Sequence, residues 1–337
     1  MAVTPHEMSE RLIAEFIAQS DVTDATRIKY RSHLGGLARW LSHERVGTLT
    51  DASTGDLVRY MTYLRSGDRF AAVRHHRVTG TLSPSARKNV LASIHSLYRY
   101  LVLVDVIVRD PSAPFKPPRV PHVPGLHLEP EEVRAILDAH GGAPRERIQA
   151  YLLAYTAARV GELGSLRWRD VDLQHGTITL VGKRDKIRIV DIHPRLMSEL
   201  RRWYLQQDDD ARRSPALRRA KDDPATDHVL LTRTGMPVAT TVISEQLKRR
   251  AVRAGVRVRE RPDGDLTSAV SPHALRRTFA TTLLDAGHHI DAIADVLGHT
   301  SIDTTRRHYA FASNARRRAT VLAYEPQVNR ESPPWAA

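Results

Sequence analysis

Apolar residues recur every three to four positions through the first hundred residues, which is the spacing of one helix face. The clearest stripe is Tyr30, Leu34, Leu37 and Leu41, which would share one face of a helix. This spacing predicts four helices joined by short loops. They cover residues 6–20, residues 24–43, a stretch that begins after Thr50 or Asp51 and includes Leu64, and residues 84–103. We therefore expect a small all-helical domain, with a basic loop at 65–82.

The periodicity stops at residues 110–126, which contain six prolines. Proline cannot continue a helix or a central strand, and this density favours an extended linker over a loop within one domain. A 337-residue chain also exceeds a comfortable single core, so two domains are expected.

The second half mixes helical and strand patterns. Two short runs rich in β-branched residues, 176–181 and 187–192, flank a basic turn and predict a β-hairpin. Residues 208–227 are polar and of mixed charge, and we expect them to form a surface insertion. The remaining predicted elements are a strand at 228–231 and helices at 129–139, 145–157, 194–207, 239–254, 272–287, 289–297, 301–313 and 314–324. The predicted fold class is mainly α with a small β-hairpin or sheet.

Composition and charge narrow the function. The net charge is +13, and only seven of the 51 basic residues are lysines, so arginine dominates. A strong positive field favours a polyanion, and the planar arginine fork suits phosphate. The absence of cysteine excludes disulfides and thiolate chemistry. No apolar run is long enough to span a bilayer and the N-terminus does not resemble a signal peptide, so we expect a cytoplasmic protein.

Candidate chemistry gathers in residues 273–309, which contain His273, Arg276, His299 and Tyr309. Arginine can grip a phosphate, histidine can transfer protons near neutral pH, and tyrosine can act as a nucleophile. This set suits attack on a phosphodiester. An arginine-rich surface helix with an incidental tyrosine is the alternative for this stretch alone.

Four sequence elements carry a resemblance to the tyrosine recombinases, the phage-integrase family that includes the Xer proteins. They are the box Ala158-Arg-Val-Gly-Glu-Leu163, the hairpin Gly182-Lys183, the box from His273 to Thr281, and Leu297-Gly-His299 followed by Tyr309. The resemblance implies an N-terminal four-helix core-binding (SAM-like) domain at 1–109, a linker at 110–126, a catalytic domain at 127–325 and a tail at 326–337.

The resemblance also implies a role for each residue. Arg159 and Arg276 would clamp the scissile phosphate with help from His299, and Tyr309 would attack it. Lys183 would protonate the departing 5′-oxygen, although Arg184 and Lys186 share its hairpin. His273 would serve as a general acid or base, or would cap its helix. Glu162 would orient rather than react. Further DNA contacts are expected from Arg27, Lys29, Arg31, Arg87, Lys88, Arg184, Lys186 and Arg277.

Some features stay ambiguous at this level. His299 lies ten residues before Tyr309, where family members more often have nine. The acidic triplet 208–210 and the adjacent histidine pairs at 75–76 and 288–289 superficially suggest metal ligands, but solvated surface residues fit them better. No cofactor or metal is expected.

The expected partner is double-stranded DNA with inverted half-sites, bound by a homotetramer or together with a related recombinase. No membrane partner is expected. The leading hypothesis is therefore a site-specific recombinase that cleaves and rejoins DNA through a 3′-phosphotyrosyl intermediate. A catalytically silent DNA-binding regulator and a type IB topoisomerase are the alternatives. The sequence does not distinguish integration, excision and dimer resolution.

Overall fold

The computed structural model describes residues 4–66, 81–120, 125–182 and 186–298. The chain divides into two compact units, residues 1–122 and 123–337. Each unit has its own hydrophobic core.

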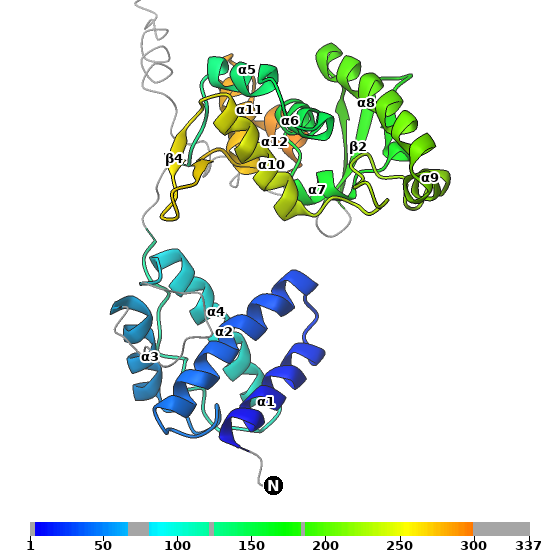
Figure 1. The fold of residues 1–337 in the computed structure, drawn as a ribbon. Helices are drawn as coiled ribbons and strands as arrows, with labels where there is room; N and C mark the ends of the chain where they lie inside the picture. Colours follow the sequence, from blue (N-terminus) through cyan, green and yellow to red (C-terminus); the bar gives the residue numbers. More distant parts are fainter. Residues whose placement is uncertain (1–3, 67–80, 121–124, 183–185, 299–337) are drawn as a thin grey trace, which may run out of the picture. The chain divides into compact units, whose positions relative to one another are not determined.

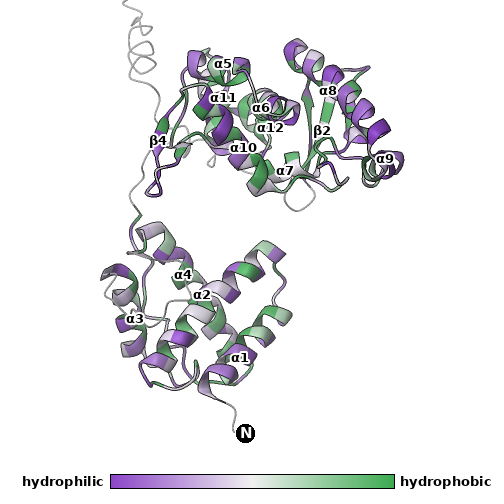
Figure 2. Cartoon of the chain, in the orientation of Figure 1, coloured by the Kyte–Doolittle hydropathy of each residue, from purple (hydrophilic) through white to green (hydrophobic). Residues whose placement is uncertain are grey.

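The N-terminal unit contains the four helices that the periodicity predicts (Figure 1). They are α1 (Pro5–Gln19), α2 (Asp24–His43), α3 (Thr54–Ser66) and α4 (Pro84–Leu103). Thr4 and Glu7 form a reciprocal capping box at the start of α1, and Ser83 caps α4. Figure 2 shows hydrophobic and hydrophilic residues interleaved along the same helices, as expected of amphipathic helices.

The core of this unit joins all four helices. Leu34, Leu37 and Leu41 of α2 are fully buried, as the apolar stripe predicts. The buried Tyr98 of α4 donates its hydroxyl to the carbonyl of Leu49, at 2.9 Å, and so ties α4 to the α2–α3 connection.

The first part of the proline-rich segment packs on the N-terminal unit. Ser112 is fully buried and hydrogen-bonds His95 at 2.9 Å, and Phe115 contacts the helical core. Leu126 and Leu128 instead join the core of the C-terminal unit. Packing on the first unit therefore continues beyond residue 109, where the sequence pattern ended the first domain.

The described residues of the C-terminal unit are mainly helical and include two small antiparallel sheets. Its described helices are α5 (Pro130–Asp138), α6 (Pro144–Thr156), α7 (Val160–Ser165), α8 (Pro194–Arg213), α9 (Pro215–Asp222), α10 (Thr240–Arg253), α11 (Pro272–Asp285) and α12 (Ile290–Leu297), with a 3₁₀ turn at Trp168–Asp170. The first sheet has the order β1 (Val171–Asp172), β2 (Thr177–Val181), β3 (Ile187–Asp191). The second pairs β4 (Val258–Glu260) with β5 (Leu266–Ser268).

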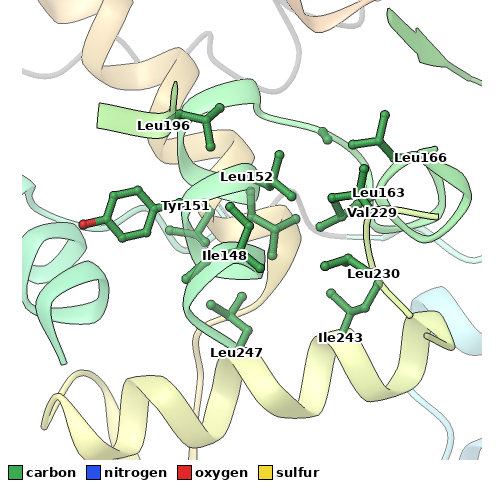
Figure 3. Packing of buried hydrophobic residues seen from close by; sticks show 14 of the residues in the cluster. Ile148, Tyr151, Leu152, Leu163, Leu166, Leu196, Val229, Leu230, Ile243 and Leu247 are labelled. Atoms are coloured by element: carbon green, nitrogen blue, oxygen red, sulfur yellow. The ribbon is translucent and has the colours of Figure 1, made fainter. Parts of the chain in front are cut away.

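Helix α6 is the centre of this unit, because α5, α7, α8, α10 and α11 all contact it. Figure 3 shows Ile148 and Leu152 of α6 in the same hydrophobic cluster as Ile243 and Leu247 of α10. All four side chains are at most 2% exposed. Because α6 leads directly to Arg159, this packing fixes where the first sequence box lies.

One sequence prediction in this unit is wrong, and the helix predicted at 194–207 continues to Arg213. Residues 208–227 are largely helical, because Ala211, Leu217 and Ala220 form a small core with Leu231, and Asp209 pairs with Arg213 one turn along α8. Residues 228–231 form isolated bridges rather than a strand.

The sequence pattern also misses the hairpin β4–β5. Its turn is closed by a hydrogen bond from Arg261 N to Asp265 O, 2.8 Å, with Gly264 at φ +86°. The mainly helical fold class is confirmed, and the helices predicted at 301–313 and 314–324 lie outside the described residues.

The central packing predicts a stability effect. Leu152 is fully buried, so Leu152→Ala should lower the free energy of unfolding by about 3 kcal/mol, through lost burial and a residual cavity. Leu205 of α8 is 69% exposed and serves as the matched control. Leu205→Ala should change the free energy of unfolding by less than about 0.5 kcal/mol. Urea unfolding of both variants measures the difference, and equal midpoints would contradict the packing described.

Candidate active site

Arg159 lies at a sharp break between α6 and α7. Ala157 ends α6 in the left-handed region at φ +49°, a conformation that costs a residue with a Cβ on the order of 1 kcal/mol. Arg159 then serves as the N-cap of α7, and its backbone N–H donates to Glu162 Oε2 at 2.8 Å. The break projects the Arg159 side chain outward, where it is 43% exposed.

Glu162 is the most heavily hydrogen-bonded carboxylate of the described site. Its Oε1 accepts from Nη1 of Arg159 and Nη1 of Arg188, both at 2.8 Å. Its Oε2 accepts from the Arg159 backbone N–H and from Arg188 Nη2, also at 2.8 Å. The Glu162 and Arg188 side chains are only 3% and 7% exposed. Burial alone would raise the pKa of Glu162, but these hydrogen bonds outweigh it and hold the pKa below its ordinary value.

Arg276 connects the same region to the end of α12. This α11 residue is 2% exposed, and its Nη1 donates to the carbonyl of Ala157 at 2.6 Å. Its Nη2 donates to the carbonyl of Leu297 at 2.5 Å. One guanidinium thus binds the backbone just before Arg159 and the backbone two residues before His299.

Two glycines pack tightly around the Glu162–Arg188 pair. A Cβ on Gly182 would lie 3.1 Å from Glu162 Oε1, and a Cβ on Gly298 would lie 3.0 Å from Arg188 Cδ. These glycines immediately precede Lys183 and His299 in the sequence. The Glu162–Arg188 pair therefore lies where the chain segments of Arg159, Lys183 and His299 approach one another.

The structure describes some of the predicted site residues and not others. It brings the segments of Arg159 and Arg276 together. His273 is exposed in the first turn of α11, and Ser271, rather than His273, caps that helix by accepting from Ala274 N–H. Lys183, Arg184, His299 and Tyr309 lie outside the described residues.

The residues predicted to contact DNA are spread over several elements. Arg27, Lys29 and Arg31 lie on α2 and are all exposed, and Nη1 of Arg27 lies 3.9 Å from Oδ1 of Asp24. On α4, Lys88 is exposed and Arg87 is half-buried. Lys186 is exposed at the hairpin, and its carbonyl accepts from Gly182 N–H at 2.7 Å. Arg277 is half-buried, and its guanidinium occupies the space that a Cβ on Gly125 would need.

Arg188 is a site residue that sequence reasoning missed. The sequence pattern places it in the strand Ile187-Arg-Ile-Val, whose isoleucines suggest the buried face. The structure reverses this, since Ile187 and Ile189 are 62% and 66% exposed while Arg188 is 8% exposed. The signal lies in β2, whose Ile178 and Leu180 define the inner face and pair with Val190 and Arg188.

Two features are absent from the described part of the chain. Within those residues, no group of three or more His, Asp or Glu side chains has an arrangement suited to a metal ion. Nor does any helix there combine the length and apolar character that crossing a bilayer requires.

Both the sequence and the fold of this chain are similar to those of known proteins. The chain is 31% identical over 293 residues to tyrosine recombinase XerC of Myxococcus xanthus, covering 83% of this chain and 91% of that protein. The XerH recombinase bound to its difH substrate shares the fold, with a TM-score of 0.66 at 20% identity, covering 96% and 98% of the two chains. A lambda integrase dimer bound to a core site also shares the fold, with a TM-score of 0.63 at 16% identity, covering 93% and 79%.

The fold and this sequence relationship define a tyrosine recombinase, an enzyme of site-specific DNA recombination that breaks and rejoins DNA strands. The sequence profile of the phage integrase family matches residues 127–316. The chain therefore belongs to the phage integrase family, as its sequence boxes predicted.

The lowered pKa of Glu162 predicts a pH dependence of stability. A depressed carboxyl pKa stabilises the fold above the ordinary glutamate value of 4.5, and this contribution is lost as the pH falls through the folded-state pKa. At pH 7, Glu162→Gln should cost roughly 3 kcal/mol, because it leaves Arg188 buried without its counter-ion. The difference between variant and wild type should narrow below about pH 4.5. Urea unfolding between pH 7 and pH 3 tests this, and parallel pH profiles would count against it.

Proposed function

We propose that Tyr309 is the nucleophile of this recombinase. Its hydroxyl oxygen attacks a phosphodiester, a bond forms to phosphorus, and the bond to the 5′-oxygen breaks. The product is a 3′-phosphotyrosyl enzyme that conserves the bond energy for rejoining. The observation that supports this assignment most is the joint anchoring of Arg159 and Arg276, which gathers two guanidinium groups beside the chain segments that precede Lys183 and His299.

The two arginines stabilise the negative charge that develops on the non-bridging phosphate oxygens. Arg159 is suited to this because Glu162 fixes one end of its guanidinium while 43% of the side chain stays exposed. Arg276 has its plane fixed by the carbonyls of Ala157 and Leu297. Groups held before the reaction stabilise a transition state without reorganisation, and each such donor is worth roughly 10²–10³ in rate.

The remaining roles follow the family resemblance. Lys183 donates the proton to the departing 5′-oxygen, His299 assists the phosphate clamp, and His273 takes the tyrosine proton or holds the phosphate. The exposure of His273 at the start of α11 is compatible with contact to a bound substrate.

The substrate proposed for this chain is duplex DNA with inverted half-sites, bound by four protomers. The XerH and lambda integrase structures contain DNA, and the lambda integrase is a dimer on its site. The basic residues exposed on α2 and Lys88 of α4 supply a surface for phosphate contacts in this chain.

A trapping experiment tests the nucleophile. The probe is a nicked duplex whose sequence is selected with the wild-type protein from a library of randomised inverted repeats. Wild type should form a covalent protein–DNA adduct visible on a denaturing gel, and Tyr309→Phe should form none while binding the same duplex. Tyr324→Phe is the matched control and should behave as wild type. An adduct from Tyr309→Phe would refute the assignment, and binding without any wild-type adduct would favour a DNA-binding regulator.

Salt dependence tests the N-terminal surface. Each phosphate contact adds about one unit to the slope of log affinity against log salt concentration, so Arg31→Ala should reduce that slope by about one. Arg213→Ala, which removes an exposed arginine paired with Asp209 on α8, is the control and should leave the slope unchanged. Fluorescence anisotropy with the selected duplex at several salt concentrations measures the slope for both variants. An unchanged slope for Arg31→Ala would show that Arg31 does not contact a DNA phosphate.

A further inference from the structure

Arg188 forms the most enclosed ion pair at the candidate active site. Both terminal nitrogens of its guanidinium donate to the two oxygens of Glu162 at 2.8 Å. Such a planar two-bond pair is stronger and more directional than a single contact. The pair is almost completely buried, whereas Arg159, the other cation on Glu162, is 43% exposed.

The charges of these three groups do not cancel. Glu162 contributes one negative charge, and Arg159 and Arg188 contribute two positive charges. Because Arg188 already satisfies the carboxylate with two hydrogen bonds, the group retains a net positive charge at its exposed end, on Arg159. Without Arg188, the buried carboxylate would have Arg159 as its remaining cationic partner among these groups. That pair would be neutral and would attract a phosphate less.

Arg188 also links the hairpin to both sequence boxes. It extends from β3 to Glu162 of α7, and its Cδ lies against the Cβ position of Gly298 after α12. The other strand of the hairpin ends beside Glu162 at Gly182. The strand that leads away from the predicted general acid is therefore bonded, through Arg188, to the carboxylate that holds Arg159, and the strand that leads to it ends against the same carboxylate.

We propose that Arg188 is a positioning residue for DNA cleavage: it acts as the counter-ion of Glu162 and thereby leaves the charge of Arg159 for the scissile phosphate. This role rests on the proposed function, in which Arg159 contacts that phosphate. In this role Arg188 acts through Glu162, to which it donates both hydrogen bonds, rather than on the substrate directly.

The test is the single-turnover rate of adduct formation on the selected nicked duplex, with affinity measured separately by gel shift. Arg188→Met should slow cleavage roughly 10²-fold, as for loss of one preorganised donor, because Glu162 would then neutralise the charge of Arg159, its remaining cationic partner among these groups. The double variant Glu162→Gln/Arg188→Met should cleave about tenfold faster than Arg188→Met, since the neutral amide no longer competes for Arg159. A purely structural role of Arg188 predicts no such rescue.

Two further variants keep the test decisive. Arg147→Met is the matched control, because Arg147 forms a similar two-bond pair with Glu199, at 2.8 Å, on α6 and α8. It should cleave within about twofold of wild type, as expected for an independent site. Arg188→Lys keeps the counter-charge and should cleave faster than Arg188→Met. If thermal unfolding shows that Arg188→Met does not fold, Arg188→Gln, which also removes the positive charge, takes its place in each comparison.

The outcomes separate the two proposals. Absence of an adduct from the wild type would overturn the proposed function and this role with it. A cleaving wild type whose Arg188→Met variant cleaves equally fast would overturn the role of Arg188 alone. The same conclusion follows if the double variant is no faster than Arg188→Met, or if Arg188→Lys is as slow as Arg188→Met.

Discussion

One buried carboxylate constrains the described part of the active site. Glu162 accepts hydrogen bonds from the backbone and side chain of Arg159 and from both ends of the Arg188 fork. A buried charge with any partner missing is costly, so α7 and the hairpin strand must approach each other in this one arrangement. Gly182 and Gly298 leave room for the pair where a side chain would not. The relative placement of the sequence boxes is thus a consequence of satisfying one negative charge.

Arg276 connects two further chain segments, through hydrogen bonds to backbone carbonyls rather than through an ion pair. It binds the carbonyls of Ala157 and Leu297, both of which lie at helix ends whose last carbonyls lack helical partners. Ala157 adopts a left-handed conformation that a residue with a Cβ avoids. The surrounding core holds this conformation, and the result is a helix start at Arg159 that points its guanidinium outward. Rigid packing around α6 therefore serves the placement of a single side chain.

The sequence predicted the helical pattern well where apolar residues repeat on one face, as in α2 and α4. It did not predict the helices within 208–227, whose alanines and Leu217 form a small core with Leu231. Arg159 and Arg276 were recognised because their boxes are local in sequence. Arg188 was not, because its role depends on strand register, which turned two isoleucines outward and an arginine inward. A local sequence pattern does not show which distant residue a charged side chain will pair with.

The most direct measurement is a structure of the Tyr309→Phe protein bound to its selected duplex. We predict that guanidinium nitrogens of Arg159 and Arg276 lie within hydrogen-bond distance of the non-bridging oxygens of one phosphate. In that complex Glu162 remains paired with Arg188, and the substituted ring at position 309 faces the same phosphorus. A complex in which the phosphate nearest position 309 contacts neither arginine would contradict this arrangement.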